Sequence, residues 1–227
     1  MTDLFLNPPE LPLVAPSILS ADFARMGEQC EKVISAGADL LHLDVMDGHF
    51  VPNLTMGPDM CRALHHALPD VFLDVHLMVT DPGMFIEPFA RAGADHLTWH
   101  METVGERKSA ELTKKTHALG LSAGVAINPP TDPELIAGYL DHADMILVMS
   151  VNPGYSGQSF IPFVLDTVRL LRAELNYTGR IQMDGGINPE TVSDCLEAGC
   201  DVVVAASAIF RQPPEMWGGI VRALRGQ

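Results

Sequence analysis

The sequence has few basic residues and no long apolar run. Its 227 residues include 14 Lys or Arg against 29 Asp or Glu, so its formal net charge is -15 at pH 7. Nucleic-acid binding is not expected, because phosphate backbones are bound by basic surfaces. No segment approaches the ~20 apolar residues of a membrane-spanning helix, so we expect no membrane insertion. An anionic small substrate would need a local anion site that acts against the overall field.

Sorting signals and paired cysteines are also lacking. The N-terminal residues MTDLFLNPPELP contain neither a basic segment nor a long apolar one, and do not resemble a signal peptide. The four cysteines form no C-x-x-C pair, and they are Cys30, Cys61, Cys195 and Cys200. We therefore expect free thiols in a cytoplasmic, reducing compartment.

A phrase related to Ala-Gly-Ala-Asp recurs before four apolar runs. Three of the four copies contain a glycine that is typical of a helix end, and each following run is typical of a buried parallel strand. Four further short apolar runs lie at residues 13–19, 71–79, 121–127 and 180–183. The aspartates of the repeated phrase, spaced 56, 49 and 57 residues apart, are Asp39, Asp95, Asp144 and Asp201.

Helical patterns fill the gaps between these runs, for example at residues 22–36, 82–92, 105–119 and 160–175. Alternating strands and helices predict a parallel sheet with right-handed crossovers. Eight such units in 227 residues fit the lower end of the (β/α)8 TIM barrel size range. A doubly wound sheet is the alternative, but no G-x-G-x-x-G turn follows the first strand. We predict one barrel domain over residues 1–227, with residues 1–11 as an N-terminal tail.

Polar residues are concentrated near the carboxyl ends of the predicted strands, where barrel active sites lie. The second strand carries His42 and Asp44, which share a face because they are two residues apart; the third carries His76 and the seventh Asp184. Desolvating such a cluster is costly unless a cation compensates. One divalent metal ion (Zn, Fe(II), Mn or Co) suits these ligands. The alternative is that each is an ordinary hydrogen-bonded core residue.

Asp44 and Asp184 could also transfer protons from opposite faces of a substrate. A free Asp has a pKa near ~3.9, low for a general base, so a metal would have to acidify the substrate C–H bond. An acid and a base on opposite faces are what inversion at a carbon centre requires.

Three loops rich in small residues follow the sixth, seventh and eighth predicted strands. Backbone N–H groups there could bind phosphate, although the glycines could instead serve only to form tight turns. None of the four lysines lies at a strand end, which argues against a Schiff-base aldolase. The expected phosphate-binding residues are Gly154, Tyr155, Ser156, Gly157, Gly185, Gly186, Ala206 and Ser207, and further pocket-lining candidates are Met46, Met78, Met149 and His100.

The segments LHLDVMDGHFVPNLT, DVHLMV, VNPGYSGQSFI and MDGGIN resemble the ribulose-phosphate 3-epimerase family in order and spacing, from about Ala15 to Phe210. The resemblance implies a barrel that forms homo-oligomers and interconverts D-ribulose 5-phosphate and D-xylulose 5-phosphate. It also implies four metal ligands, with Asp44 as proton acceptor and Asp184 as donor, and sugar contacts from Ser17 and His76. The implied ligands are His42, Asp44, His76 and Asp184.

Three positions, in two loops, depart from the family pattern. The usual PGFGGQ loop reads PGYSGQ here, with Tyr155 and Ser156, and the usual Gly-Ser at the eighth strand is Ala206–Ser207. If Ser156 or Ala206 adopts a positive φ, we expect a cost of ~1 kcal/mol and weaker phosphate binding or loop closure.

Three alternatives to this function remain open. They are an epimerase for a related ketose phosphate such as allulose 6-phosphate, a decarboxylase or aldolase on the same barrel, and a non-catalytic sugar-phosphate binder. Against the second, Met46 stands where the related decarboxylases carry a lysine. Against the third, both carboxylates and both histidines of the cluster are retained.

Overall fold

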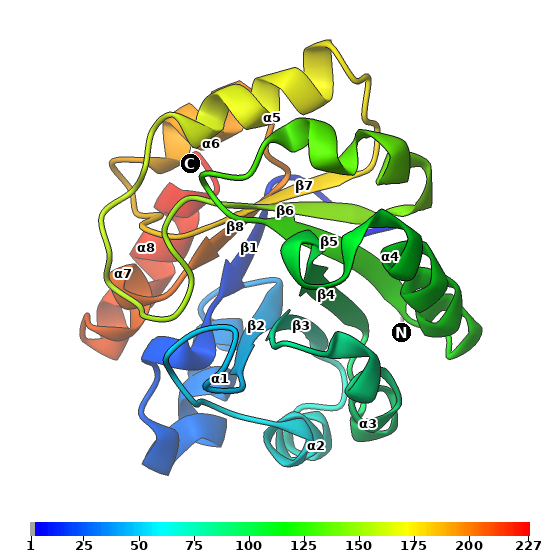
Figure 1. Ribbon diagram of the computed structural model, residues 1–227. Coiled ribbons are helices and arrows are strands. Elements are labelled where there is room, and N and C mark those ends of the chain that lie inside the picture. The colour runs from blue at the N-terminus through cyan, green and yellow to red at the C-terminus, as the bar shows by residue number, and fades with distance from the viewer. Residues whose placement is uncertain (1–2) are drawn as a thin grey trace.

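The computed structural model describes residues 3–227 as a barrel of eight parallel strands with helices outside it (Figure 1). The strands are β1 (Leu13–Pro16), β2 (Leu40–Met46), β3 (Phe72–Met78), β4 (His96–His100), β5 (Ser122–Ile127), β6 (Met145–Met149), β7 (Arg180–Asp184) and β8 (Val202–Ala205). The α-helices are α1 (Met26–Ser35), α2 (Pro58–Ala67), α3 (Ile86–Ala92), α4 (Met101–Ala118), α5 (Val164–Ala173), α6 (Val192–Ala198), α7 (Ser207–Phe210) and α8 (Trp217–Leu224). The 3-10 helices are η1 (Ile18–Ser20), η2 (Phe23–Arg25), η3 (Pro82–Met84), η4 (Pro133–His142) and η5 (Pro214–Met216). This alternation confirms the predicted (β/α)8 barrel.

The barrel closes between its first two strands. The strand order is β1-β8-β7-β6-β5-β4-β3-β2, with parallel pairing throughout. β1 and β2, the two ends of this order, meet through a parallel bridge between Ser17 and His42. β1 ends at Pro16, earlier than the predicted run 13–19, because Ser17 caps η1 by accepting a hydrogen bond from the N–H of Leu19. Closure therefore brings a predicted substrate-binding residue next to a predicted metal ligand.

Some predicted helices have different bounds. Residues 22–36 form η2 followed by α1, because the Asp22 side chain accepts a hydrogen bond from the N–H of Ala24 and begins the 3-10 turn. α4 begins at Met101 rather than residue 105, and it is kinked at Gly105, whose φ is 71°. These shifts leave the barrel topology unchanged, since each lies within a connection between strands.

The repeated aspartates have a structural role at the amino ends of the strands. Each precedes an even-numbered strand and accepts a hydrogen bond from a backbone N–H at or beside the start of the preceding odd-numbered strand. This fixes neighbouring strands in register and explains the repeat along the chain. Asp39 accepts from Val14, Asp95 from Leu73, Asp144 from Ala123 and Asp201 from Ile181, at 2.7–2.9 Å.

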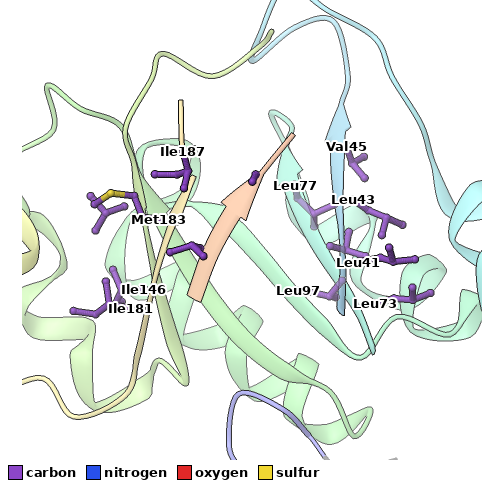
Figure 2. Packing of buried hydrophobic residues seen from close by; sticks show 14 of the residues in the cluster. Leu41, Leu43, Val45, Leu73, Leu77, Leu97, Ile146, Ile181, Met183 and Ile187 are labelled. Atoms are coloured by element: carbon purple, nitrogen blue, oxygen red, sulfur yellow. The ribbon is translucent and has the colours of Figure 1, made fainter. Parts of the chain in front are cut away.

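Alternate strand residues point to opposite sides of the sheet, which divides the core into two layers. Figure 2 shows Leu41, Leu43 and Val45 of β2, which belong to the cluster that packs between the sheet and the helices. The residues between them in sequence, His42 and Asp44, therefore face the barrel interior. The same two-residue alternation along β2 therefore buries Leu41 and Leu43 against the helices and directs His42 and Asp44 into the barrel.

The predicted N-terminal tail covers the amino end of the barrel. Phe5 is buried, and its ring packs edge-on against Phe72 and His96, with centroids 5.2 and 4.6 Å away. Its carbonyl accepts a hydrogen bond from Arg180 Nε at 2.9 Å. Residues 1 and 2 lie outside the described residues. Within residues 3–227, no helix has both the length and the apolarity needed to cross a membrane.

Candidate active site and metal centre

Four predicted ligands meet inside the barrel near the carboxyl ends of three strands. His42 and Asp44 come from β2, His76 from β3 and Asp184 from β7, and one donor atom of each lies within 4.8 Å of the others. Asp44 Oδ1 lies 3.4 Å from His42 Nε2 and 3.2 Å from His76 Nδ1. His76 Nδ1 is also 3.9 Å from Asp184 Oδ2. The strand register places Asp44 directly beside His76, so the sheet itself sets this geometry.

The cluster attracts positive charge. Burial alone would lower the pKa of His42, but Asp74 and Asp44 beside it raise that pKa well above its usual value. Burial lowers the pKa of His76 to about 4, so this imidazole is neutral near pH 7, as a metal ligand must be. Once His42 also releases its proton, the two neutral imidazoles and the carboxylates suit a divalent transition metal.

The two carboxylates have divergent acidities. Burial opposes the ionisation of Asp44, yet His42 and His76 outweigh it and hold the pKa of Asp44 well below its usual range. Burial and the nearby charge of Asp44 raise the pKa of Asp184 to about 7. Without a cation, Asp44 is therefore ionised near neutral pH, whereas Asp184 is protonated on about half of the molecules.

Asp74 and Gln182, which were not predicted from the sequence, hold His42 in place. His42 Nδ1 lies 2.7 Å from Asp74 Oδ2, and the same oxygen accepts a hydrogen bond from Gln182 Nε2 at 2.7 Å. All three side chains are buried. The bond to Asp74 fixes the imidazole with its proton on Nδ1, which leaves Nε2 toward the cluster. A signal for both residues existed, because each lies two positions before a predicted ligand on the same strand.

One nitrogen of the cluster lacks a hydrogen-bond partner. His42 Nε2 is buried without a hydrogen-bond partner in the described structure, and it faces the Asp44 carboxylate. A buried unpartnered nitrogen is costly unless it binds something. The residues present therefore fit a divalent metal held by two imidazoles and two carboxylates.

His100 lies behind the cluster and not in the wall of the cavity where it was predicted. It is fully buried, and its Nε2 lies 2.9 Å from His76 Nε2. Its Nδ1 lies 3.3 Å from Glu102 Oε2 at the start of α4. Glu102 in turn accepts hydrogen bonds from Asn128 N at 2.7 Å and Thr131 Oγ1 at 2.5 Å. His100 and Glu102 thus restrict the orientation of His76.

A cavity of about 480 Å³ opens above the carboxylates. Ser17 Oγ, at its wall, donates a hydrogen bond to Asp44 Oδ2 at 2.5 Å. Beyond the predicted set, the wall includes Arg211, which has no sequence signal because it lies past a four-residue helix and outside the strand pattern. The predicted residues that line the cavity are Ser17, Asp44, Met46, Met78, Met149, Gly154, Tyr155, Ser156, Gly157, Asp184, Gly185, Gly186, Ala206 and Ser207.

Residues Tyr155 and Ser156 change the loop after β6 without straining it. The Tyr155 hydroxyl donates a hydrogen bond to the Pro52 carbonyl at 2.8 Å, and Asn53 Nδ2 donates one to the Gly154 carbonyl at 2.8 Å. These bonds join the loop to the one after β2. Among residues 3–227, Asn176 is the only non-glycine residue with positive φ, so the strain considered for Ser156 and Ala206 does not arise.

Gly185 and Gly186 are required by close packing as well as by conformation. Their φ angles are 125° and 66°. A Cβ on Gly185 would lie 2.5 Å from a Val151 methyl carbon, and one on Gly186 would lie 2.5 Å from Phe160 N. The loop after β7 can therefore lie against the loop after β6 only with glycine at both positions.

Comparisons with known proteins agree with this geometry. The ribulose-phosphate 3-epimerase family model matches residues 13–210. Curated ribulose-phosphate 3-epimerases are 46% identical over 204 residues in Synechocystis sp. (88% of each chain) and 44% identical over 205 residues in Escherichia coli (88% of this chain, 90% of that one). A solved 3-hexulose-6-phosphate synthase, 17% identical, aligns over 94% of this chain and 98% of its own with a TM-score of 0.72, which shows the shared fold alone. By sequence, the chain belongs to the ribulose-phosphate 3-epimerase family, whose members are isomerases.

Proposed function

We propose that this enzyme interconverts D-ribulose 5-phosphate and D-xylulose 5-phosphate by proton transfer at C3. The observation that carries the proposal is a pair of carboxylates in one cavity, the buried Asp44 and the half-buried Asp184, whose pKa values are shifted in opposite directions. The names of the curated relatives support the choice of substrate.

The metal in this proposal is Zn, Fe(II), Mn or Co, since the ligand set suits each of them. His42, Asp44, His76 and Asp184 would hold it. When bound, a divalent cation would polarise the C2 carbonyl of the sugar and stabilise the negative charge that follows loss of the C3 proton.

Asp44 acts as the base toward ribulose 5-phosphate. Its carboxylate removes the C3 proton, and the C–H electron pair moves toward C2 and its oxygen to give an enediolate. The Ser17 hydroxyl, 2.5 Å from Asp44 Oδ2, orients this carboxylate. His42 and His76 keep Asp44 ionised, at the expense of its strength as a base, so C3 must be acidified for the step to proceed.

Asp184 acts as the acid on the opposite face. Its raised pKa, about 7, leaves it protonated on a large fraction of molecules at neutral pH. It gives this proton to C3 from behind while the electron pair returns from the enediolate, which inverts the carbon. Exchange of both carboxyl groups with solvent restores the starting protonation, and the reverse reaction uses the same groups in exchanged roles.

The remaining cavity wall binds the phosphate and excludes water. We propose that backbone N–H groups of residues 154–157, 185–186 and 206–207 bind the phosphate oxygens. Met46, Met78 and Met149 line the same cavity and are nearly fully buried, so they would keep the enediolate dry.

Turnover assays test this function and its alternatives. Purified protein should convert ribulose 5-phosphate to xylulose 5-phosphate, lose activity with a chelator and regain it with added divalent metal. Metal analysis of protein purified without chelator would identify the ion. Faster turnover of allulose 6-phosphate would favour that substrate, and binding without turnover of either sugar in the metal-loaded protein would reject catalysis.

We also propose a homo-oligomer in the cytoplasm. The family resemblance supports the assembly, and four buried free cysteines suit a reducing compartment. Light scattering coupled to size-exclusion chromatography tests the assembly. A measured mass near that of one chain, 24.6 kDa, would contradict a homo-oligomer.

A further inference from the structure

Arg211 brings a positive charge to a cavity whose other charged residues are acidic. Of the residues in 3–227 that line the cavity, it alone is Lys or Arg, and Asp44 and Asp184 are the carboxylates. Arg211 directly follows α7, yet its guanidinium lies against the loop after β6. A Cβ built on Gly157 would be 3.0 and 3.2 Å from its two terminal nitrogens. Arg211 therefore connects the loops after β6 and β8.

The charge of Arg211 has no carboxylate partner within the described residues. Seven of the ten arginines form ion pairs within 4.0 Å, and Arg107, Arg211 and Arg222 do not. Arg211 differs from the other two because it lines the cavity. An anion entering the cavity thus meets a guanidinium that no acidic side chain neutralises.

The overall charge makes such a group important. With a formal net charge of -15, the field of the chain repels an anionic substrate. Backbone N–H groups supply only partial charges, whereas a guanidinium carries a full charge and a planar pair of donors that matches two phosphate oxygens. Arg211 therefore gives the cavity a full positive charge, which the loops after β6, β7 and β8 do not supply through any lysine.

We infer that Arg211 binds the substrate phosphate and ties it to the loop after β6. The identity of the substrate rests on the proposed function, whereas the anion site rests on the cavity itself. Gly157, with a φ of 82°, can lie against the guanidinium because it has no side chain. A phosphate on Arg211 would contact the loop at the same time, so substrate binding would hold the loop over the cavity.

The matched variants Arg211→Gln and Arg222→Gln test this inference. Both residues are exposed, both lack an ion-pair partner and both substitutions remove one positive charge, but Arg222 lies on α8 outside the cavity. Two quantities are measured at fixed ionic strength: KM for ribulose 5-phosphate, and Kd for inorganic phosphate by calorimetry. Melting temperatures establish that both variants fold.

For Arg211→Gln we expect KM and the phosphate Kd each to rise on the order of tenfold, about 1.4 kcal/mol, with most of the loss in KM rather than kcat. For Arg211→Lys, KM and the phosphate Kd should lie between those of the wild type and Arg211→Gln, because lysine restores the positive charge but not the planar pair of N–H donors. Arg222→Gln should match the wild type in both quantities. Equal effects of Arg211→Gln and Arg222→Gln, or a loss in kcat with unchanged phosphate binding, would overturn the inference. If the wild type does not epimerise the sugar, the proposed function fails, and the phosphate Kd alone still decides the role of Arg211.

Discussion

Replacing Asp184 with asparagine should separate proton exchange at C3 from inversion at C3. Asparagine keeps the size of the side chain and one oxygen for a metal, but its amide cannot act as a carboxylic acid. In the wild type, burial and the charge of Asp44 raise the pKa of Asp184 to about 7, so a transferable proton is present near neutral pH. In Asp184→Asn that proton is lost, while Asp44 and its hydrogen bond from Ser17 remain.

The size of the effect follows from the lack of a substitute acid. Among residues 3–227, the only other carboxylate in the cavity wall is Asp44, which serves the other face. The Tyr155 hydroxyl in the wall already donates to the Pro52 carbonyl, and the alcohol and amide groups that make up the rest of its uncharged polar side chains do not donate a proton readily at neutral pH. Epimerisation should therefore fall by ~10²–10⁴-fold, the usual contribution of a positioned acid or base, while C3 exchange by Asp44 stays within about tenfold of the wild type.

Deuterium labelling measures both rates on one sample. In deuterated water, Asp184→Asn should place deuterium at C3 of recovered ribulose 5-phosphate and form little xylulose 5-phosphate, as read by NMR. Asp44→Asn, given xylulose 5-phosphate as the starting sugar, should place deuterium at C3 of the recovered xylulose 5-phosphate and form little ribulose 5-phosphate. Asp59→Asn, at a side chain that is 93% exposed, is the control. Near-normal epimerisation by either active-site variant, with metal content verified by elemental analysis, would refute the assignment of two bases.

Three further predictions concern the surroundings of the cluster. Asp74→Asn should weaken metal binding ~10–100-fold, because it removes the carboxylate that orients His42; Co(II) titration against a competing chelator measures this, and unchanged affinity contradicts it. Glu102→Gln should weaken metal binding by at most about tenfold, whereas Glu106→Gln, further along α4, should have no effect in the same titration. Burial opposes the ionisation of Asp47, but hydrogen bonds from neighbouring groups outweigh it and hold its pKa below the usual value. Because its folded pKa is depressed, Asp47→Asn should be less stable than the wild type at pH 7, and the difference should shrink as pH falls below about 4; urea unfolding at pH 7 and pH 3 that shows a constant difference would contradict this.

The barrel and its four-residue cluster could be predicted because both depend on local periodicity. Strands buried on both sides give short apolar runs, and a spacing of two residues fixes which side chains share a face. This rule alone was enough to predict that His42 and Asp44 point to the same side of the sheet. Their meeting with Asp184, from β7, additionally required the closure of the barrel, which follows once eight strand–helix units are recognised.

The parts that were missed depend on contacts between segments far apart in the sequence. Asp74 and Gln182 have the same two-residue spacing to a predicted ligand, but the hydrogen bond that gives them their role joins residues 108 apart in the sequence. Arg211 reaches Gly157 through a rotamer and a helix end that no periodic pattern encodes. Phe5 lies in a proline-containing segment with no strand or helix pattern, yet the open amino end of the barrel offers apolar surface that its ring can cover.

The same residue type has separate roles at the two ends of the strands. At the amino ends, Asp39, Asp95 and the two other repeated aspartates accept N–H groups of neighbouring strands, and none of them lines the cavity. At the carboxyl ends, Asp44 and Asp184 have no such backbone role and instead lie among imidazoles. Stability and chemistry are therefore separated along the strand axis, as barrel architecture permits. This separation explains how the loops around the cavity can differ from the family pattern, as they do at Tyr155, Ser156 and Ala206, without disturbing the hydrogen bonds that hold the strands in register.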